Sequence, residues 1–153
     1  MKTTNRRNFL GKGAAAAAVT AVAAVPVKAQ TASPEKKVIY RDGKKPAKPS
    51  TRMSGTVAYG NLIFISGVGY HKEGDIKVHT KAVLDSIKAQ LESAGSSMNK
   101  VLKCNVYCTD PKYRTAINEV YVRYFPKNPP TRLLIIVTPW GDFDVEVDCI
   151  AAT

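Results

Sequence analysis

Histidine and cysteine, the side chains that most often bind metals or act as nucleophiles, are few in this chain. His71 and His79 are isolated, and no third ligand accompanies them at the spacing of a metal site. Cys104 and Cys108 would lie about 13 Å apart on an extended strand, too far for a disulfide, and neither forms a CxxC motif. We therefore expect no metal, and we expect Cys104, Cys108 and Cys149 to be buried as small hydrophobic side chains, with a metal or redox site as the alternative.

Arg132 and Glu146 are of types that can bind an acid and move a proton. A guanidinium can hold a carboxylate through two parallel, charge-assisted hydrogen bonds. A glutamate whose pKa is raised by burial can transfer protons to and from water. Both residues fall on the last two strands predicted for the chain, which we expect to form a hairpin. The structural alternative is an ordinary cross-strand ion pair, which contributes well under about 1 kcal/mol.

The first half of the domain that must position these residues reads as a hairpin and a helix. β-prone runs at 56–58 and 62–66 flank the turn dipeptide Gly60-Asn61. A polar loop is expected from 69 to 77. Between 79 and 94, apolar residues recur at helical spacing, and Gly95 stands where a helix C-terminal glycine belongs.

The second half predicts a strand, a helix and two more strands. After a strand at 101–109, Asp110-Pro111 can cap and begin a helix whose buried stripe includes Ile117, Val120, Tyr121 and Tyr124. Strands at 132–138 and 144–152 follow, joined by a turn at 139–141. The order predicts an α+β fold, with two helices on one face of a single mixed sheet. Because residues 133–137 are apolar on both sides, we expect another subunit to cover the open face.

Charge is distributed unevenly along the chain. Most of the formal net charge of +11 comes from residues 1–52, whereas basic and acidic side chains nearly balance from residue 53 to 153. The folded part therefore does not carry the basic surface of a nucleic-acid-binding domain, and we expect no nucleic-acid partner.

Residues 1–29 predict a signal peptide. A basic start precedes an apolar run and the cleavage pattern Val27-Lys28-Ala29, and Arg6-Arg7 followed by Phe9-Leu10 resembles the twin-arginine export signal. The apolar run is shorter than the roughly 20 residues of a membrane span, so an uncleaved anchor is the weaker alternative and no stable membrane insertion is expected. We expect a periplasmic or other extracytoplasmic location.

Residues 30–52, rich in Lys, Pro and Ser, predict a flexible basic lead-in, within which 38–40 could add an edge strand. The domain itself is expected at 53–153.

Six segments of this domain resemble, in order and spacing, the Rid (YjgF) family of reactive-intermediate deaminases. They are 60–67 (GNLIFISG), 94–97 (AGSS), 106–110 (VYCTD), 118–126 (NEVYVRYFP), 129–132 (PPTR) and 145–148 (VEVD). The resemblance implies a homotrimer of chorismate-mutase-like subunits with clefts between neighbours. It also implies hydrolysis of 2-imino acids, such as 2-iminobutanoate and 2-iminopropanoate, to 2-oxo acids and ammonia without a cofactor.

The resemblance also assigns roles to individual residues. The family arginine that holds the substrate carboxylate falls on Arg132, and the family glutamate near the reacting water falls on Glu146. Gly67, Leu134 and Asn118 match further substrate-binding positions, Leu134 through its backbone.

This chain departs from the family pattern at three positions. Met53 stands where many members have a site tyrosine, Leu134 where many have cysteine, and Val68 where glutamine is usual. A non-catalytic trimer that binds a small carboxylate is therefore the alternative function. Ribonuclease activity is disfavoured by the nearly neutral domain and by the absence of a His or Lys constellation.

Overall fold

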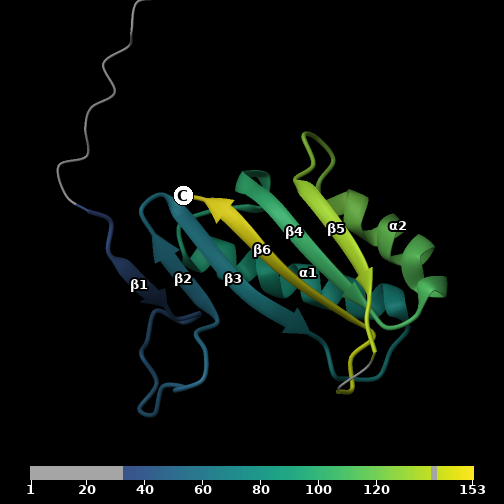
Figure 1. Ribbon diagram of the computed structural model, residues 1–153, viewed down its shortest axis with the longest axis horizontal. Coiled ribbons are helices and arrows are strands. Elements are labelled where there is room, and N and C mark those ends of the chain that lie inside the picture. The colour runs from purple at the N-terminus through teal and green to yellow at the C-terminus, as the bar shows by residue number, and fades with distance from the viewer. Residues whose placement is uncertain (1–32, 139–140) are drawn as a thin grey trace, which may run out of the picture. The chain divides into compact units, whose positions relative to one another are not determined.

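A computed structural model describes residues 33–138 and 141–153 of the chain, and residues 33–153 form one compact unit (Figure 1). The predicted signal peptide at 1–29 lies outside the described residues, as do two residues of the predicted turn, 139 and 140. No helix of the described part is long and apolar enough to cross a membrane.

Six strands form a single mixed sheet in the order β1-β2-β3-β6-β4-β5. All neighbouring strands are antiparallel except β4 and β5, which are parallel because helix α2 carries the chain back between them. The strands are β1 (Lys36–Ile39), β2 (Thr56–Tyr59), β3 (Leu62–Gly69), β4 (Val101–Cys108), β5 (Thr131–Ile136) and β6 (Val145–Ala152).

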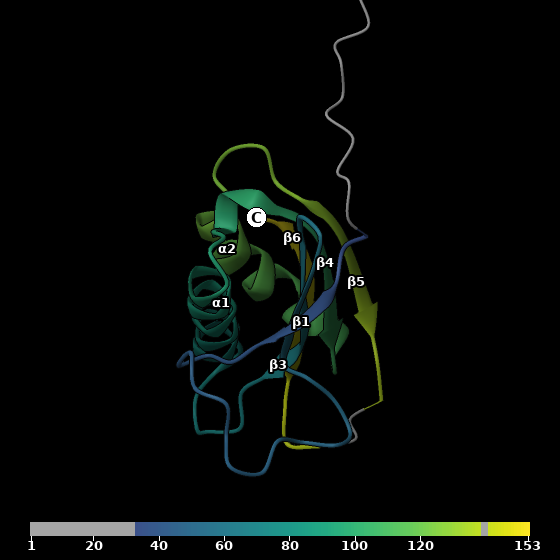
Figure 2. The same ribbon diagram turned by 90° about the vertical axis from the view of Figure 1, so that its left-hand side faces the viewer.

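Helices α1 (Ile76–Ser93) and α2 (Arg114–Tyr124) both cover the same face of the sheet (Figure 2). This arrangement confirms the predicted α+β fold. The short 3₁₀ turns Met98–Lys100 and Pro111–Tyr113 precede β4 and α2.

Local capping signals decide where the helices begin. The Asp110 carboxylate accepts the Lys112 backbone N–H at 2.9 Å, as the Asp110-Pro111 pair predicted. Helix α1 begins earlier than the predicted residue 79, because Asp75 caps it by accepting the backbone N–H groups of Lys77 and Val78 at 2.9 Å.

The core fills the space between the sheet and the two helices. The predicted stripes of both helices are buried there, except that Tyr124 is only partly buried, and all three cysteines are buried, as expected. The helix residues of this core include Val83, Ile87, Leu91, Ile117, Val120 and Tyr121.

The prediction of a hairpin between the last two strands was wrong. Strand β4 lies between β5 and β6, so β5 is an edge strand paired only with β4. The parallel β4–α2–β5 crossover places β5 on the outer side of β4. Strand β6 then pairs with both β3 and β4 in the middle of the sheet.

The domain begins before the boundary at residue 53 that we expected. Strand β1 pairs with β2, which confirms the edge strand proposed for 38–40, and the compact unit starts at Ser33. The following turn reaches helix α1, where the Arg41 guanidinium donates to Ser86 Oγ at 2.6 Å and Ser93 Oγ donates to the Arg41 carbonyl at 2.8 Å. The lead-in therefore contributes a strand and a docked turn to the fold.

The face of the sheet opposite the helices carries apolar side chains. Val38, Val57, Phe64 and Ile150 are register partners across four neighbouring strands, and they form one row on this open face. Residues Val38, Phe64, Leu133 and Ile135 are 37%, 38%, 53% and 36% exposed. The row and the two β5 residues are separated by Lys103, Asn105 and Asp148, so the open face carries two apolar patches, and exposed apolar patches are typical of protein interfaces.

Candidate active site

Arg132 lies on β5 and is braced by helix α2. One of its Nη2 N–H groups donates to Asn118 Oδ1 at 2.8 Å, and its guanidinium carbon lies 4.5 Å from the centre of the Tyr121 ring. The hydrogen bond and the cation–π contact fix the orientation of an otherwise exposed side chain. The other N–H donors of the guanidinium can then bind a carboxylate.

Leu134 follows Arg132 on the same side of β5 and packs against the core. The Val137 N–H donates to the Cys108 carbonyl of β4 at 2.9 Å. Because backbone groups alternate in direction along a strand, the Leu134 N–H points the other way, to the open edge of the sheet. The edge thus offers a backbone donor on the strand that carries Arg132.

Glu146 lies on β6, on the open face of the sheet. It is opposite Tyr107 of β4 and Gly69 of β3 in the sheet register. Its carboxylate lies over Gly67, where a Cβ atom would stand only 1.8 Å from Glu146 Oε1. Only glycine at position 67 leaves room for this position of the carboxylate.

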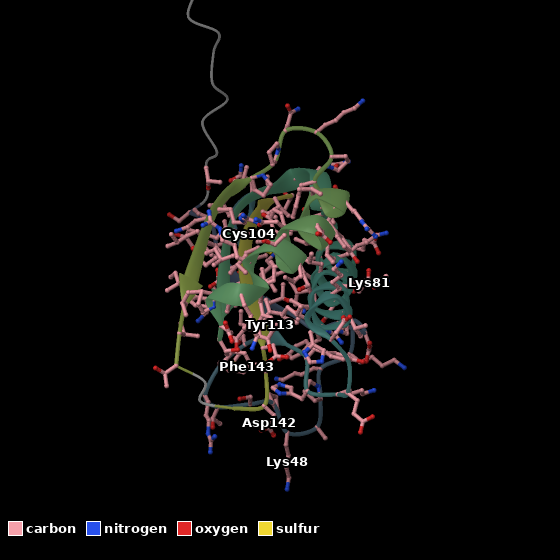
Figure 3. The ribbon with its side chains drawn as sticks, turned by 90° about the vertical axis from the view of Figure 1, so that its right-hand side faces the viewer. Lys48, Lys81, Cys104, Tyr113, Asp142 and Phe143 are labelled. Carbon is pink, nitrogen blue, oxygen red and sulfur yellow. The ribbon has the colours of Figure 1, made fainter. Side chains whose placement is uncertain are left out.

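A cavity of about 270 Å³ adjoins the Glu146 carboxylate. It is lined by Tyr107, Val137, Phe143 and Glu146. Figure 3 shows Phe143 in the loop that leads into β6. A small substrate and one water molecule fit a space of this size.

Burial raises the pKa of Glu146, the neighbouring Asp148 raises it further, and His71 acts in the opposite direction. Asp148 accepts hydrogen bonds from Asn105 Nδ2 at 2.9 Å and from the Tyr107 hydroxyl at 3.0 Å. The hydrogen bond to Asp148 is also the main cause that raises the pKa of Tyr107. A glutamate with a raised pKa is suited to proton transfer closer to neutral pH.

The sequence-predicted residues fall into two groups that a single chain keeps apart. Arg132, Asn118 and Leu134 lie on the helix side and the edge, whereas Glu146 and Gly67 lie on the open face. Arg132 pairs with Cys104 of β4, and Glu146 pairs with Tyr107, three residues further along that strand. Three residues span about 10 Å along the strand, and the two strand spacings from β5 to β6 span about 10 Å across the sheet. The Cα atoms of Arg132 and Glu146 therefore lie on the order of 14 Å apart.

The separation of Arg132 and Glu146 also removes the cross-strand ion pair considered as the structural alternative. Sequence reasoning missed Asp148 and Tyr121 as neighbours of these residues. Asn105 and Tyr107 lie on the face of β4 opposite the cysteines, and the wrong strand pairing hid their contact with Asp148.

Among residues 33–138 and 141–153, no group of three or more His, Cys, Asp or Glu side chains could hold a metal ion. His79 has structural contacts: Nε2 lies 3.0 Å from the Lys72 carbonyl and Nδ1 lies 3.1 Å from Asp144 Oδ2. Met53, at the position of the family tyrosine, is 57% exposed and brings no hydroxyl to either group of residues.

Comparison with known proteins identifies relatives over most of the chain. The model of the endoribonuclease L-PSP family matches residues 43–153. A RutC family protein of Pyrococcus abyssi is 38% identical over 124 residues, which are 76% of this chain and 96% of that protein.

Solved structures share the fold. A putative endoribonuclease of Thermotoga maritima is 31% identical with a TM-score of 0.66, and the match covers 76% of this chain and 97% of that one. A protein of unknown function of the Rid family from Yersinia pestis has a TM-score of 0.69 at 24% identity, and the match covers 78% and 100% of the two chains.

Proposed function

The chain belongs to the endoribonuclease L-PSP family, which includes the Rid or YjgF proteins, and from this premise we propose that it hydrolyses reactive 2-imino acids to 2-oxo acids and ammonia. The observation that carries the proposal is the Arg132 guanidinium, held in place by Asn118 and Tyr121 with donors left over for a carboxylate. A 2-imino acid presents a carboxylate next to the C=N carbon that must react.

Arg132 binds and does not react. Its two charge-assisted hydrogen bonds to the substrate carboxylate fix the position of the imine carbon, and the Leu134 N–H at the sheet edge adds a third donor. Asn118 is a positioning residue, because it acts on the substrate through Arg132.

Glu146 handles water and protons. Its carboxylate takes a proton from a water molecule as the water oxygen bonds to the imine carbon. The carboxyl group returns this proton to the nitrogen, which gives a carbinolamine. It then takes the proton of the new hydroxyl group and delivers it to the same nitrogen, so that the carbonyl forms, the C–N bond breaks and ammonia leaves. The pKa of Glu146, raised by burial, favours both halves of this cycle, and Gly67 leaves room for the carboxylate.

Two copies of the chain build each site in this proposal. Arg132 and Glu146 lie too far apart in one chain to reach the same small substrate. We propose a homotrimer in which the sheet edge of one subunit meets the open face of the next. The exposed apolar residues Phe64, Leu133 and Ile135 support burial of that face against another subunit.

We also propose that the enzyme works outside the cytoplasm, on the strength of the Arg6-Arg7 motif and the apolar run and cleavage pattern that follow it. Replacing both arginines with lysine should leave the full-length protein in the cytoplasm. An unchanged distribution between cell fractions would contradict export by the twin-arginine route.

The activity is tested with an imine generated in situ by an amino-acid oxidase. Purified protein should accelerate loss of the imine, and Arg132→Ala should abolish the acceleration while the protein stays folded. Binding of a 2-oxo acid without any acceleration would favour the non-catalytic carboxylate-binding alternative. Cleavage of RNA by protein lacking residues 1–32, with no effect on imines, would favour a ribonuclease instead.

A further inference from the structure

Two of the three buried cysteines face each other across neighbouring strands. Cys104 of β4 and Cys149 of β6 are direct register partners in an antiparallel pair, and each is 1% exposed. Both side chains point to the helix side of the sheet, and Figure 3 shows Cys104 between the sheet and α2. The sequence did not predict that these two cysteines lie opposite each other, because we expected β6 to pair with β5.

The geometry of this pair fits a covalent bond. Directly opposite residues of antiparallel strands have Cα atoms about 4.5 to 5.5 Å apart. A disulfide joins Cα atoms that are about 4.4 to 6.8 Å apart. The bond can therefore form between the two side chains without a change in the register of the sheet.

The third cysteine is a control provided by the chain itself. Cys108 lies on the same strand and the same face as Cys104 and is also fully buried. Its register partner is Val145, and its thiol donates to the Asp110 carbonyl at 3.1 Å. Cys104 and Cys108 thus share a strand, a face and almost complete loss of exposed surface, but no cysteine stands opposite Cys108.

We propose that Cys104 and Cys149 form a reversible cross-strand disulfide. The bond forms when the chain folds, or opens locally, in the presence of a small organic disulfide. One thiol loses its proton and attacks the oxidant, which gives a mixed disulfide and releases one oxidant thiol. The second cysteine attacks the protein sulfur of the mixed disulfide and releases the other oxidant thiol. Two cysteine thiols are oxidised, and one disulfide is reduced to two thiols.

Burial controls when this reaction can occur. Burial raises the pKa of Cys104, and it raises the pKa of Cys149 to about 12, so thiolate is scarce in the closed fold. Oxidation must then take place during folding or local opening, after which the closed fold protects the bond. The twin-arginine export proposed above carries folded proteins into an oxidising compartment, so there the bond would form through local opening, and such bonds persist in that compartment.

Within each subunit, the bond would lie between the arginine of one proposed site and the glutamate of another. Cys104 is the register partner of Arg132 on the other side of β4, and the Arg132 charge acts to lower the pKa of Cys104. Cys149 belongs to the strand that carries Glu146. The disulfide would therefore join the strand beside the arginine to the strand of the glutamate. Detection of the disulfide does not depend on deaminase activity, because the experiment measures the covalent bond itself.

The test uses the full-length chain, reduced and unfolded in denaturant, so that all three thiols are accessible. Refolding takes place in a mixture of 2-hydroxyethyl disulfide and 2-mercaptoethanol, followed by alkylation and peptide mass mapping. We expect a Cys104–Cys149 linked peptide in protein with the native circular dichroism spectrum, and an alkylated Cys108. Native protein with three free thiols, or a mixture of all three possible pairings, would overturn the proposal.

Variants separate the pair from the control. Cys108→Ala should form the linked peptide as the unchanged chain does, whereas Cys149→Ala should form none. Oxidised protein should also melt several degrees above its dithiothreitol-reduced form, since the bond closes a long loop of the unfolded chain. If Cys149→Ala does not fold, the Cys108→Ala variant still tests the proposal. Absence of the Cys104–Cys149 linked peptide in that variant would contradict the proposal, and so would equal melting temperatures of its oxidised and reduced forms.

Discussion

Replacing Gly67 with alanine should displace the Glu146 carboxylate and leave the fold intact. Gly67 is not among the glycines with positive φ, so its backbone accepts an alanine. The new Cβ would stand 1.8 Å from Glu146 Oε1, 2.8 Å from Cδ and 3.3 Å from Cγ. These atoms form the end of a flexible side chain, which can rotate away at small cost in stability.

The size of the displacement sets the expected loss of activity. Cβ atoms essentially never approach other heavy atoms closer than 3.0 Å, so Oε1 must retreat from 1.8 Å by at least about 1.2 Å. A misplacement of about 1 Å in a reacting group can lower the rate about 100-fold. That factor corresponds to about 2.7 kcal/mol of lost transition-state stabilisation.

The assay compares kcat/KM for imine hydrolysis in Gly67→Ala and Gly69→Ala. Gly69 lies on the same strand, but a Cβ there would meet His71 Nε2 and Phe143 Cβ at an ordinary 3.5 Å. Gly69→Ala should remain close to the unchanged protein, whereas Gly67→Ala should lose about 100-fold in kcat/KM with a similar melting temperature. Full activity in a folded Gly67→Ala variant would refute the role given to the Glu146 carboxylate.

Four further outcomes are expected. Asn118→Ala should raise KM about 10-fold with a smaller change in kcat, because Arg132 loses one charge-assisted bond of about 1.5 kcal/mol at an exposed site; an unchanged KM would contradict the bracing role. Activity should fall in acid with a midpoint above the ordinary glutamate pKa of 4.5, and a midpoint at or below 4.5 would contradict the role of Glu146. Because the folded-state pKa of Glu146 is raised, stability is lost as pH rises through that pKa, so Glu146→Gln should raise the melting temperature more at neutral pH than in acid; an equal change at both would be contrary evidence. Dialysis against a chelator should leave imine hydrolysis unchanged, and a loss restored by added metal would contradict the cofactor-free reaction.

Local signals in the sequence were sufficient to predict the helices and their buried faces. Asp110-Pro111 marks a cap whose hydrogen bond the structure contains, and the periodicity of Val83, Ile87 and Leu91 fixes the face of α1 that packs on the sheet. The start of α1 was missed because Asp75 lies within a polar, glycine-bearing segment that also reads as a loop.

Strand order could not be predicted in the same way, because pairing depends on contacts between distant segments. Residues 132–138 and 144–152 are close in sequence and separated by a turn signal, which favours a hairpin. The parallel crossover from β4 through α2 places β5 at the edge of the sheet. The strand beside β6 is therefore β4, where the sequence predicted β5. The neighbours of Glu146 and Cys149 follow from this one difference.

The family resemblance supplied four residues of the candidate site. In the structure Arg132 contacts Asn118, and Glu146 lies over Gly67, but the two pairs are apart. The sequence carried no signal for the Tyr121 ring beneath Arg132, because that contact depends on how α2 packs against the edge of the sheet. The apolar character of residues 133–137 did indicate an uncovered face.

Mixing two inactive variants tests the central claim most directly, namely that the arginine and the glutamate of each site come from different subunits. Arg132→Ala and Glu146→Gln should each be inactive alone. Refolded together in equal amounts, they should recover about a quarter of the activity of the unchanged protein, since random assembly restores that share of intersubunit sites. A mixture that forms mixed oligomers and remains inactive would contradict the account.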